Sequence, residues 1–158
     1  MATKDDGNKE EALKRALKFI SYRSRSESEV RVKLTQLGFP QEIIEATLKR
    51  LRSLNLLNDE IFARDWSQVR AEGRGYGPLR IERELRQKGI AKSLINQVVL
   101  ETFDQEVGEE RAKKLLAKRF RGQDLTDVKI LRRAIAFLQR RCYRDSVIAD
   151  LLKLASGD

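Results

Sequence analysis

The side chains in this sequence that could take part in chemistry are predominantly basic. Lysines and arginines number 33 against 24 aspartates and glutamates, and there is no histidine, so the formal net charge is +9. A chain this basic is typical of a protein with a polyanionic partner, such as nucleic acid, an anionic membrane surface or an acidic protein surface. The basic residues therefore favour a binding function that depends on charge.

Two crowded groups of basic residues are candidates for the binding surface. The first follows Pro78 on a short charged segment that ends at Gly89, and the second lies within residues 111–144, which hold twelve lysines and arginines but only two aspartates. A helix face that only solubilises the chain usually mixes in glutamates at i,i+4 spacing; this solubilising role is the alternative interpretation. The predicted partner-binding residues are Arg80, Arg83, Arg86, Lys88, Arg132, Arg133, Arg140, Arg141 and Arg144.

Residue types that perform catalysis are scarce. Without histidine, the chain has no imidazole base and no histidine–cysteine metal set. Cys142 is a lone thiol with no histidine to activate it. The adjacent carboxylates Asp59–Glu60 and Glu109–Glu110 do not face each other on a helix, and they suit helix starts, where the macrodipole favours negative charge. We therefore expect no enzyme activity, no metal and no cofactor.

Two short patterns have the outline of nucleotide- or DNA-binding motifs but lack essential parts. The glycine-rich run 73–77 follows no predicted strand and lacks the Gly-Lys-Ser/Thr ending of a phosphate-binding loop. We interpret it as a hinge or corner, with Tyr76 either packed on the next helix or exposed to a partner. Residues 85–99 have the outline of a helix-turn-helix, but the helix that would enter the major groove has only Lys92 as a basic residue. Sequence-specific DNA binding is therefore disfavoured.

The composition indicates that helices position these residues. Hydrophobic residues make up 41% of the chain, charged residues 36% and aromatic residues 6%, and only two prolines interrupt a sequence rich in helix-favouring types. No run approaches the ~18 apolar residues of a membrane span. A single cysteine fits a reducing compartment. We expect an all-α, cytoplasmic protein.

Capping residues predict where the first helices begin. We expect a flexible polar tail over residues 1–10 and a first amphipathic helix from Ala12. Ser26 and Glu29 have the spacing of a capping box, in which each side chain accepts a backbone N–H of the other residue. Asn58 can cap a later helix, since its side-chain oxygen can accept a free backbone N–H.

Two boundaries in the last third of the chain are marked more weakly. We place a break near Gly108, ahead of a helix over residues 109–120. Asp124 or Thr126 can cap the long helix that follows, since either side chain can accept a free backbone N–H.

One pattern of apolar and small residues occurs three times. In residues 34–44 a leucine is followed four positions later by a small residue, then by an apolar side chain, and by two more apolar side chains four and five positions after that. The pattern returns in residues 85–95, at an offset of 51, and in residues 138–148, at a further offset of 53. The small residues are Gly38, Gly89 and Cys142.

This recurrence predicts tandem helical repeats. A single small helical unit cannot bury its apolar face alone, so repeats of this kind stack on one another. We infer three three-helix repeats that form an elongated, curved body; the alternative is that a leucine-rich helical chain aligns with itself by chance. The predicted repeats cover residues 11–57, 58–104 and 105–158.

Three segments together resemble the RecX family, regulators of the RecA recombinase. They are Arg23–Leu34, Leu57–Ala63 and the stretch Gly75–Ile90, which opens with Gly-Tyr-Gly-Pro. The resemblance is strong over residues 12–103 and weaker, though collinear, to the C-terminus. Asn58 departs from the family pattern, where aspartate is common, and the third repeat is loosely matched.

This resemblance implies a modular helical protein that binds RecA. By it, the chain would lie in the helical groove of the RecA–DNA filament and limit filament growth, ATP hydrolysis and strand exchange, with roles in recombination, DNA repair and the SOS response. The family has no catalytic residues to carry over, and the inhibitory direction comes from the resemblance alone. The alternative is a nonspecific basic module that binds single- or double-stranded DNA directly. We expect a monomer without a membrane partner.

Overall fold

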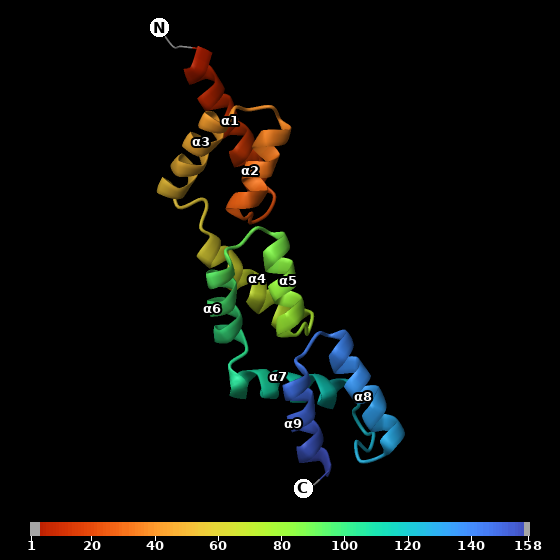
Figure 1. The fold of residues 1–158 in the computed structure, drawn as a ribbon. Coiled ribbons are helices and arrows are strands. Elements are labelled where there is room, and N and C mark those ends of the chain that lie inside the picture. Colours follow the sequence, from red (N-terminus) through yellow and green to blue (C-terminus); the bar gives the residue numbers. More distant parts are fainter. Residues whose placement is uncertain (1–3, 157–158) are drawn as a thin grey trace. The chain divides into compact units, whose positions relative to one another are not determined.

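The computed structural model describes residues 4–156, and every regular element in that range is an α-helix (Figure 1). The prediction of an all-α chain is confirmed. None of the described helices combines the length and the apolar character that a membrane span needs. The helices are α1 (Lys4–Ser21), α2 (Glu27–Gln36), α3 (Gln41–Ser53), α4 (Asp59–Gly73), α5 (Pro78–Gln87), α6 (Lys92–Thr102), α7 (Gln105–Arg119), α8 (Val128–Arg140) and α9 (Asp145–Ser156).

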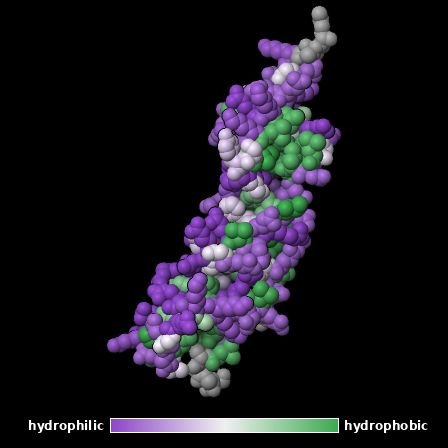
Figure 2. Space-filling view, turned by 180° about the vertical axis from the view of Figure 1, so that it is seen from behind, coloured by the Kyte–Doolittle hydropathy of each residue, from purple (hydrophilic) through white to green (hydrophobic). Residues whose placement is uncertain are grey.

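The chain divides into two compact units. The first contains the described residues up to 63 together with residues 87–91. The second contains residues 64–86 and the described residues from 92 onward. Hydrophilic side chains dominate the face drawn in Figure 2, as expected of a chain in which 36% of residues are charged.

The first unit is held together by the packing of α1, α2 and α3. Each of these helices places its apolar residues three or four positions apart, so that one stripe faces the shared core. Burying one leucine or isoleucine contributes roughly 1.5–3 kcal/mol. The buried core consists of Ala12, Ala16, Val30, Leu34, Ile43, Ile44, Leu48, Leu51 and Leu57.

The second unit includes a core cluster to which α7, α8 and α9 contribute. In this cluster the rings of Phe103 and Tyr143 meet edge to face, with centroids 6.2 Å apart. The α5 helix buries Pro78, Ile81 and Leu85 on one stripe, which leaves its arginines on the other sides of the helix. The α7–α9 cluster consists of Ala112, Leu138, Tyr143, Ile148 and Leu151.

Two predicted helix caps are confirmed. The Ser26 side chain accepts the N–H of Glu29, and the Glu29 carboxylate accepts the N–H of Ser26, so both halves of the capping box are present. Asn58 Oδ1 accepts the N–H groups of Glu60 and Ile61 at 3.0 and 3.1 Å. These caps were predictable because each depends on residues only two or three positions apart.

Three other boundaries differ from the predicted ones. The α1 helix begins at Lys4, within the stretch predicted as a polar tail. Gly108 lies inside α7, because Asp104 accepts the N–H of Val107 and starts the helix earlier.

The cap of α8 is Asp127 rather than Asp124 or Thr126, and its carboxylate accepts two N–H groups of the first turn. The Asp124 side chain instead closes a local turn by accepting from Thr126.

The three small residues of the repeated pattern share one backbone conformation. The φ angle is +85° at Gly38, +73° at Gly89 and +62° at Cys142, all in the left-handed region. At the first and third of these corners, the N–H of the next residue donates to the carbonyl of the leucine five positions earlier, at 3.2 Å in both cases. This hydrogen bond closes a helix in the Schellman manner. The predicted recurrence is therefore present in the backbone itself.

In the first unit, the start of α2 packs on the corner that follows α5. Ser26 Oγ donates to the Lys88 carbonyl at 2.6 Å, and Lys88 Nζ lies 3.0 Å from Glu29 Oε1. Gly89 comes so close that a Cβ there would lie 2.3 Å from the Cβ of Ser28. These five residues are called the first joint.

In the second unit, the start of α5 packs on the corner that follows α8. The N–H of Gly77 donates to the Arg141 carbonyl at 2.6 Å, and the N–H of Leu79 donates to the Cys142 carbonyl at 3.2 Å. A Cβ on Gly77 would lie 2.4 Å from the Cys142 carbonyl oxygen. These four residues are called the second joint.

Candidate partner-binding surfaces

The structure places Arg80 inside a network of α4 and α5 side chains. Its guanidinium lies 3.8 Å from the centroid of the Tyr76 ring, and its Nε lies 3.1 Å from Glu84 Oε1. Glu84 also pairs with Arg70 at 3.3 Å and accepts the indole N–H of Trp66 at 3.0 Å. Arg80 is thus committed to internal contacts, and Tyr76 is packed beneath it.

Lys88 is likewise engaged within the fold, at the Glu29 carboxylate. This carboxylate also lies 2.5 Å from Arg23 and 3.7 Å from Arg25. Burial by itself would raise the pKa of Glu29, but hydrogen bonds from Arg23, the Ser26 N–H and Lys88 outweigh it and lower the pKa to about 2. The cluster holds α2 to the corner at Lys88.

Arg83 and Arg86 differ from these neighbours because both are exposed and carry no ion pair to any residue in the described range. They stand three positions apart on α5, so they share a face of the helix. Ile81 and Leu85 on the same helix are fully buried, which fixes the direction in which this face points. The first predicted group therefore contains two available arginines.

Arg141 and Arg144 also make internal contacts. Arg141 donates to the Arg74 carbonyl, and its guanidinium lies 5.2 Å from the centroid of the Phe137 ring. Arg144 forms an ion pair with Glu82 on α5. Both residues connect the end of α8 to the segment around α5 within the second unit.

Arg132, Arg133 and Arg140, by contrast, line a hollow of about 240 Å³ on α8. Its other lining residues are Arg119, Phe120, Ala136 and Phe137. None of its four arginines pairs with a carboxylate among residues 4–156. This set of lining residues is called the arginine hollow.

Sequence reasoning identified three of the four arginines in the hollow and missed Arg119 and the two phenylalanines. The residues on α8 could have been grouped, since Arg133, Ala136, Phe137 and Arg140 have the i, i+3, i+4, i+7 spacing of one helix face. Arg119 could not be assigned to this group from the sequence, because a loop separates α7 from α8 and periodicity does not predict the course of a loop.

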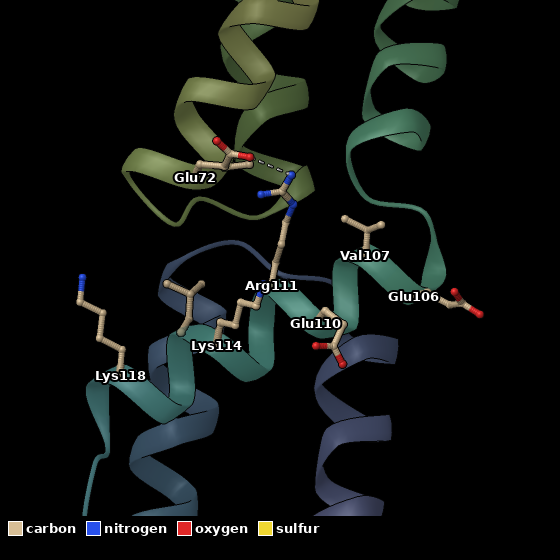
Figure 3. A pocket seen from close by; sticks show the side chains of 9 residues that line it. Glu72, Glu106, Val107, Glu110, Arg111, Lys114 and Lys118 are labelled. Atoms are coloured by element: carbon tan, nitrogen blue, oxygen red, sulfur yellow. Dashed lines mark ion pairs between the residues drawn. The ribbon is translucent and has the colours of Figure 1, made fainter.

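A larger cleft of about 690 Å³ lies between the end of α4 and α7 in the second unit. Figure 3 shows Arg111 reaching toward Glu72, with which it pairs at 3.7 Å, while Lys118 and Glu106 lie toward opposite ends of α7. Glu110 and Lys114 add one charge of each sign. Because its lining carries acidic residues as well as basic ones, the cleft does not match a polyanion.

Comparisons with known proteins identify the family of the helical modules. Models of the first and second three-helix domains of RecX match residues 12–51 and 58–99. A protein named Regulatory protein RecX from Corynebacterium efficiens is 37% identical over 153 residues, covering 93% of this chain and 72% of its own length. A protein of the same name from Mycolicibacterium smegmatis is 30% identical and is covered over 79% of its length.

Solved structures show the same relation. A crystal structure of regulatory protein RecX superposes with a TM-score of 0.70 at 33% identity, covering 90% of this chain and 72% of that one. The RecX structure from Lactobacillus salivarius shares the fold, with a TM-score of 0.81 at 21% identity over 96% of this chain and 99% of that one. The resemblance seen in the sequence is confirmed: the chain belongs to the RecX family of regulatory proteins.

Proposed function

We propose that this chain binds the RecA–DNA filament in its helical groove and restrains ATP hydrolysis, filament extension and strand exchange. The family to which it belongs consists of regulatory proteins, and its first two helical modules are those that the family models describe. A net charge of +9 suits a partner that contains DNA.

The observation that carries the location of this contact is the exposed pair Arg83 and Arg86. Their helix is anchored by buried Ile81 and Leu85, so the two guanidinium groups are presented from a fixed support. Arg80, Lys88, Arg141 and Arg144 already contact groups of the chain itself and act as its internal supports. Arg83 and Arg86 are therefore the proposed RecA-contacting residues of α5.

The test is inhibition of RecA ATP hydrolysis on single-stranded DNA. The variant Arg83→Ala/Arg86→Ala removes two charges from α5, and the matched control Lys49→Ala/Arg50→Ala removes two charges from the exposed side of α3. We expect the α5 variant to require about tenfold more protein for the same inhibition, which corresponds to about 1.4 kcal/mol. The control variant should inhibit as the unchanged chain does.

Two results would count against the proposal in different ways. Absence of inhibition by the unchanged chain at equimolar RecA would remove the proposed function. Equal inhibition by both double variants would leave the function in place but reject Arg83 and Arg86 as its contacts.

A further inference from the structure

The arginine hollow on α8 takes no part in the RecA contact proposed for Arg83 and Arg86 of α5. It collects Arg119, Arg132, Arg133 and Arg140 around one concave surface of about 240 Å³. Clustered cations repel one another, so such groups are usually interleaved with carboxylates. Within the part of the chain that the structure describes, no carboxylate is paired with any of the four. An uncompensated cluster of this kind is suited to an external anion.

One aromatic ring, that of Phe120, lies within cation–π range of two of these arginines. The guanidinium groups of Arg119 and Arg133 lie 5.6 and 5.9 Å from the centroid of the Phe120 ring, within the ~6 Å range of cation–π attraction. Phe120 is itself buried and meets Phe137 edge to face at 6.0 Å. A cation–π contact depends on the charge of the guanidinium and not on its N–H groups, so both arginines keep their donors.

Helical spacing gives the hollow its depth and its length. Ala136 lies between Arg133 and Arg140 on the same face, and its small side chain leaves the space that a longer residue would fill. Seven residues separate the two arginines, which corresponds to roughly 10 Å along the helix axis. One strand of duplex DNA carries a charge about every 3.4 Å of helix axis, so this distance spans about three phosphates.

We propose that the arginine hollow binds the phosphodiester backbone of DNA through Arg119, Arg132, Arg133 and Arg140. Arginine donates two parallel hydrogen bonds to a phosphate, and each phosphate that is neutralised releases condensed counterions. The arginine hollow contains no paired carboxylate among residues 4–156, so it suits the evenly spaced negative charges of a nucleic-acid backbone. An acidic protein surface fits it less well, since such a surface carries basic residues of its own. Contacts to phosphate carry no sequence information, so the binding is nonspecific.

The test measures DNA binding by the full chain in the absence of RecA, by fluorescence anisotropy. The probes are a labelled oligothymidylate of about 30 nucleotides and a duplex of the same length, titrated at several salt concentrations. Arg132→Gln/Arg133→Gln should weaken binding about tenfold at moderate salt, whereas Lys49→Gln/Arg50→Gln should change it less than about twofold. The slope of log K against log salt should become shallower by about 1.4 on the single strand or about 1.8 on the duplex. The preferred form of DNA is the one whose probe binds more tightly and whose slope changes by the amount expected for that probe.

A second variant tests the hollow without changing any charge. Ala136→Leu fills the space between the arginines and should reduce DNA affinity several-fold, while Ala46→Leu on the exposed face of α3 should leave it unchanged. Circular dichroism and the Tm establish that both variants are folded.

The proposal is overturned if the two double variants lose DNA affinity equally, or if Ala136→Leu binds as the unchanged chain does. It is also overturned if polyglutamate displaces the oligonucleotide as well as unlabelled DNA does at equal charge concentration, because the hollow would then accept acidic peptides. RecA is absent from the assay, so the outcome does not depend on that of the ATP hydrolysis test.

Discussion

The first joint is closed by side chains, whereas the second joint is closed by the backbone. Gly77 stands 51 residues after Ser26, and Arg141 stands 53 residues after Lys88, which are the two offsets of the repeated pattern. Equivalent positions therefore meet in both units. In the first joint a hydroxyl and an ion pair make the contact, and in the second two backbone N–H groups donate to two carbonyls.

This difference shows that a repeated contact can keep its geometry while its chemistry changes. Where Ser26 supplies a hydroxyl, Gly77 supplies its own N–H, and this requires the two backbones to approach more closely. The first joint should consequently respond to side-chain changes and to pH. The backbone contact of the second joint should respond little to pH but should tolerate no added atom at Gly77.

The largest expected effect is that of Gly77→Ala in the second joint. The new Cβ would lie 2.4–2.5 Å from backbone atoms of Cys142 and Tyr143, which cannot move without disturbing the end of α8. We expect the free energy of unfolding to fall by about 3 kcal/mol, at the upper end of overpacking effects. Urea denaturation measures this. The control is Gly73→Ala, where the Cβ meets nothing within 4 Å; a comparable loss there would contradict the role of the joint.

A smaller loss is expected for Gly89→Ala in the first joint, compared with Gly38→Ala. Both glycines have positive φ, so alanine at either position should lower the free energy of unfolding by about 1 kcal/mol through backbone strain. Only at Gly89 would the Cβ also meet a neighbour, the Ser28 side chain, at 2.3 Å. We expect Gly89→Ala to cost about 1 kcal/mol more than Gly38→Ala in urea denaturation. Equal losses would mean that the first joint adds nothing to stability.

The pH dependence of stability should identify the ion pair of the first joint. The pKa of Glu29 is about 2 in the folded chain, against an ordinary value of 4.5. The Glu29 carboxylate therefore stabilises the fold above about pH 4.5, and this stabilisation is lost as the pH falls toward 2. Solvent screening reduces this contribution to about 1–2 kcal/mol. Glu29→Gln should therefore be less stable than the unchanged chain at neutral pH by that amount. The two unfolding curves should converge in acid, and a constant difference across this range would rule the mechanism out.

The smallest effect, and one of opposite sign, is expected for Cys142→Gly at the corner of the second joint. The φ of Cys142 is +62°, which costs a residue with a side chain about 1–2 kcal/mol. Glycine avoids this strain, but it loses more conformational entropy on folding, so the net gain is smaller. We expect a stabilisation of at most about 1 kcal/mol, seen as a higher Tm. A clear destabilisation would show that the thiol packs usefully at this corner.

The parts of the fold that follow local rules were predictable. Apolar periodicity indicated the helices, Ser26 and Asn58 marked two helix starts, and the recurring corner at Gly38, Gly89 and Cys142 was visible as a spacing. The start of α8 was misplaced because Asp124, Thr126 and Asp127 all have side chains that can cap. In the structure Asp124 closes a turn with Thr126, and Asp127 accepts the free N–H groups of α8.

The sequence by itself determined the helical content, the repeated corner and the abundance of positive charge, because each depends on residue types or on neighbours a few positions apart. Only the tertiary structure decided which basic residues are available to a partner. Lys88 pairs with Glu29 across 59 positions, and Arg144 pairs with Glu82 across 62, so their charges are already compensated. Arg119 joins Arg133 at one hollow because the loop after α7 returns the chain to it. Coulomb attraction depends on distance in space, which the linear order of residues does not specify.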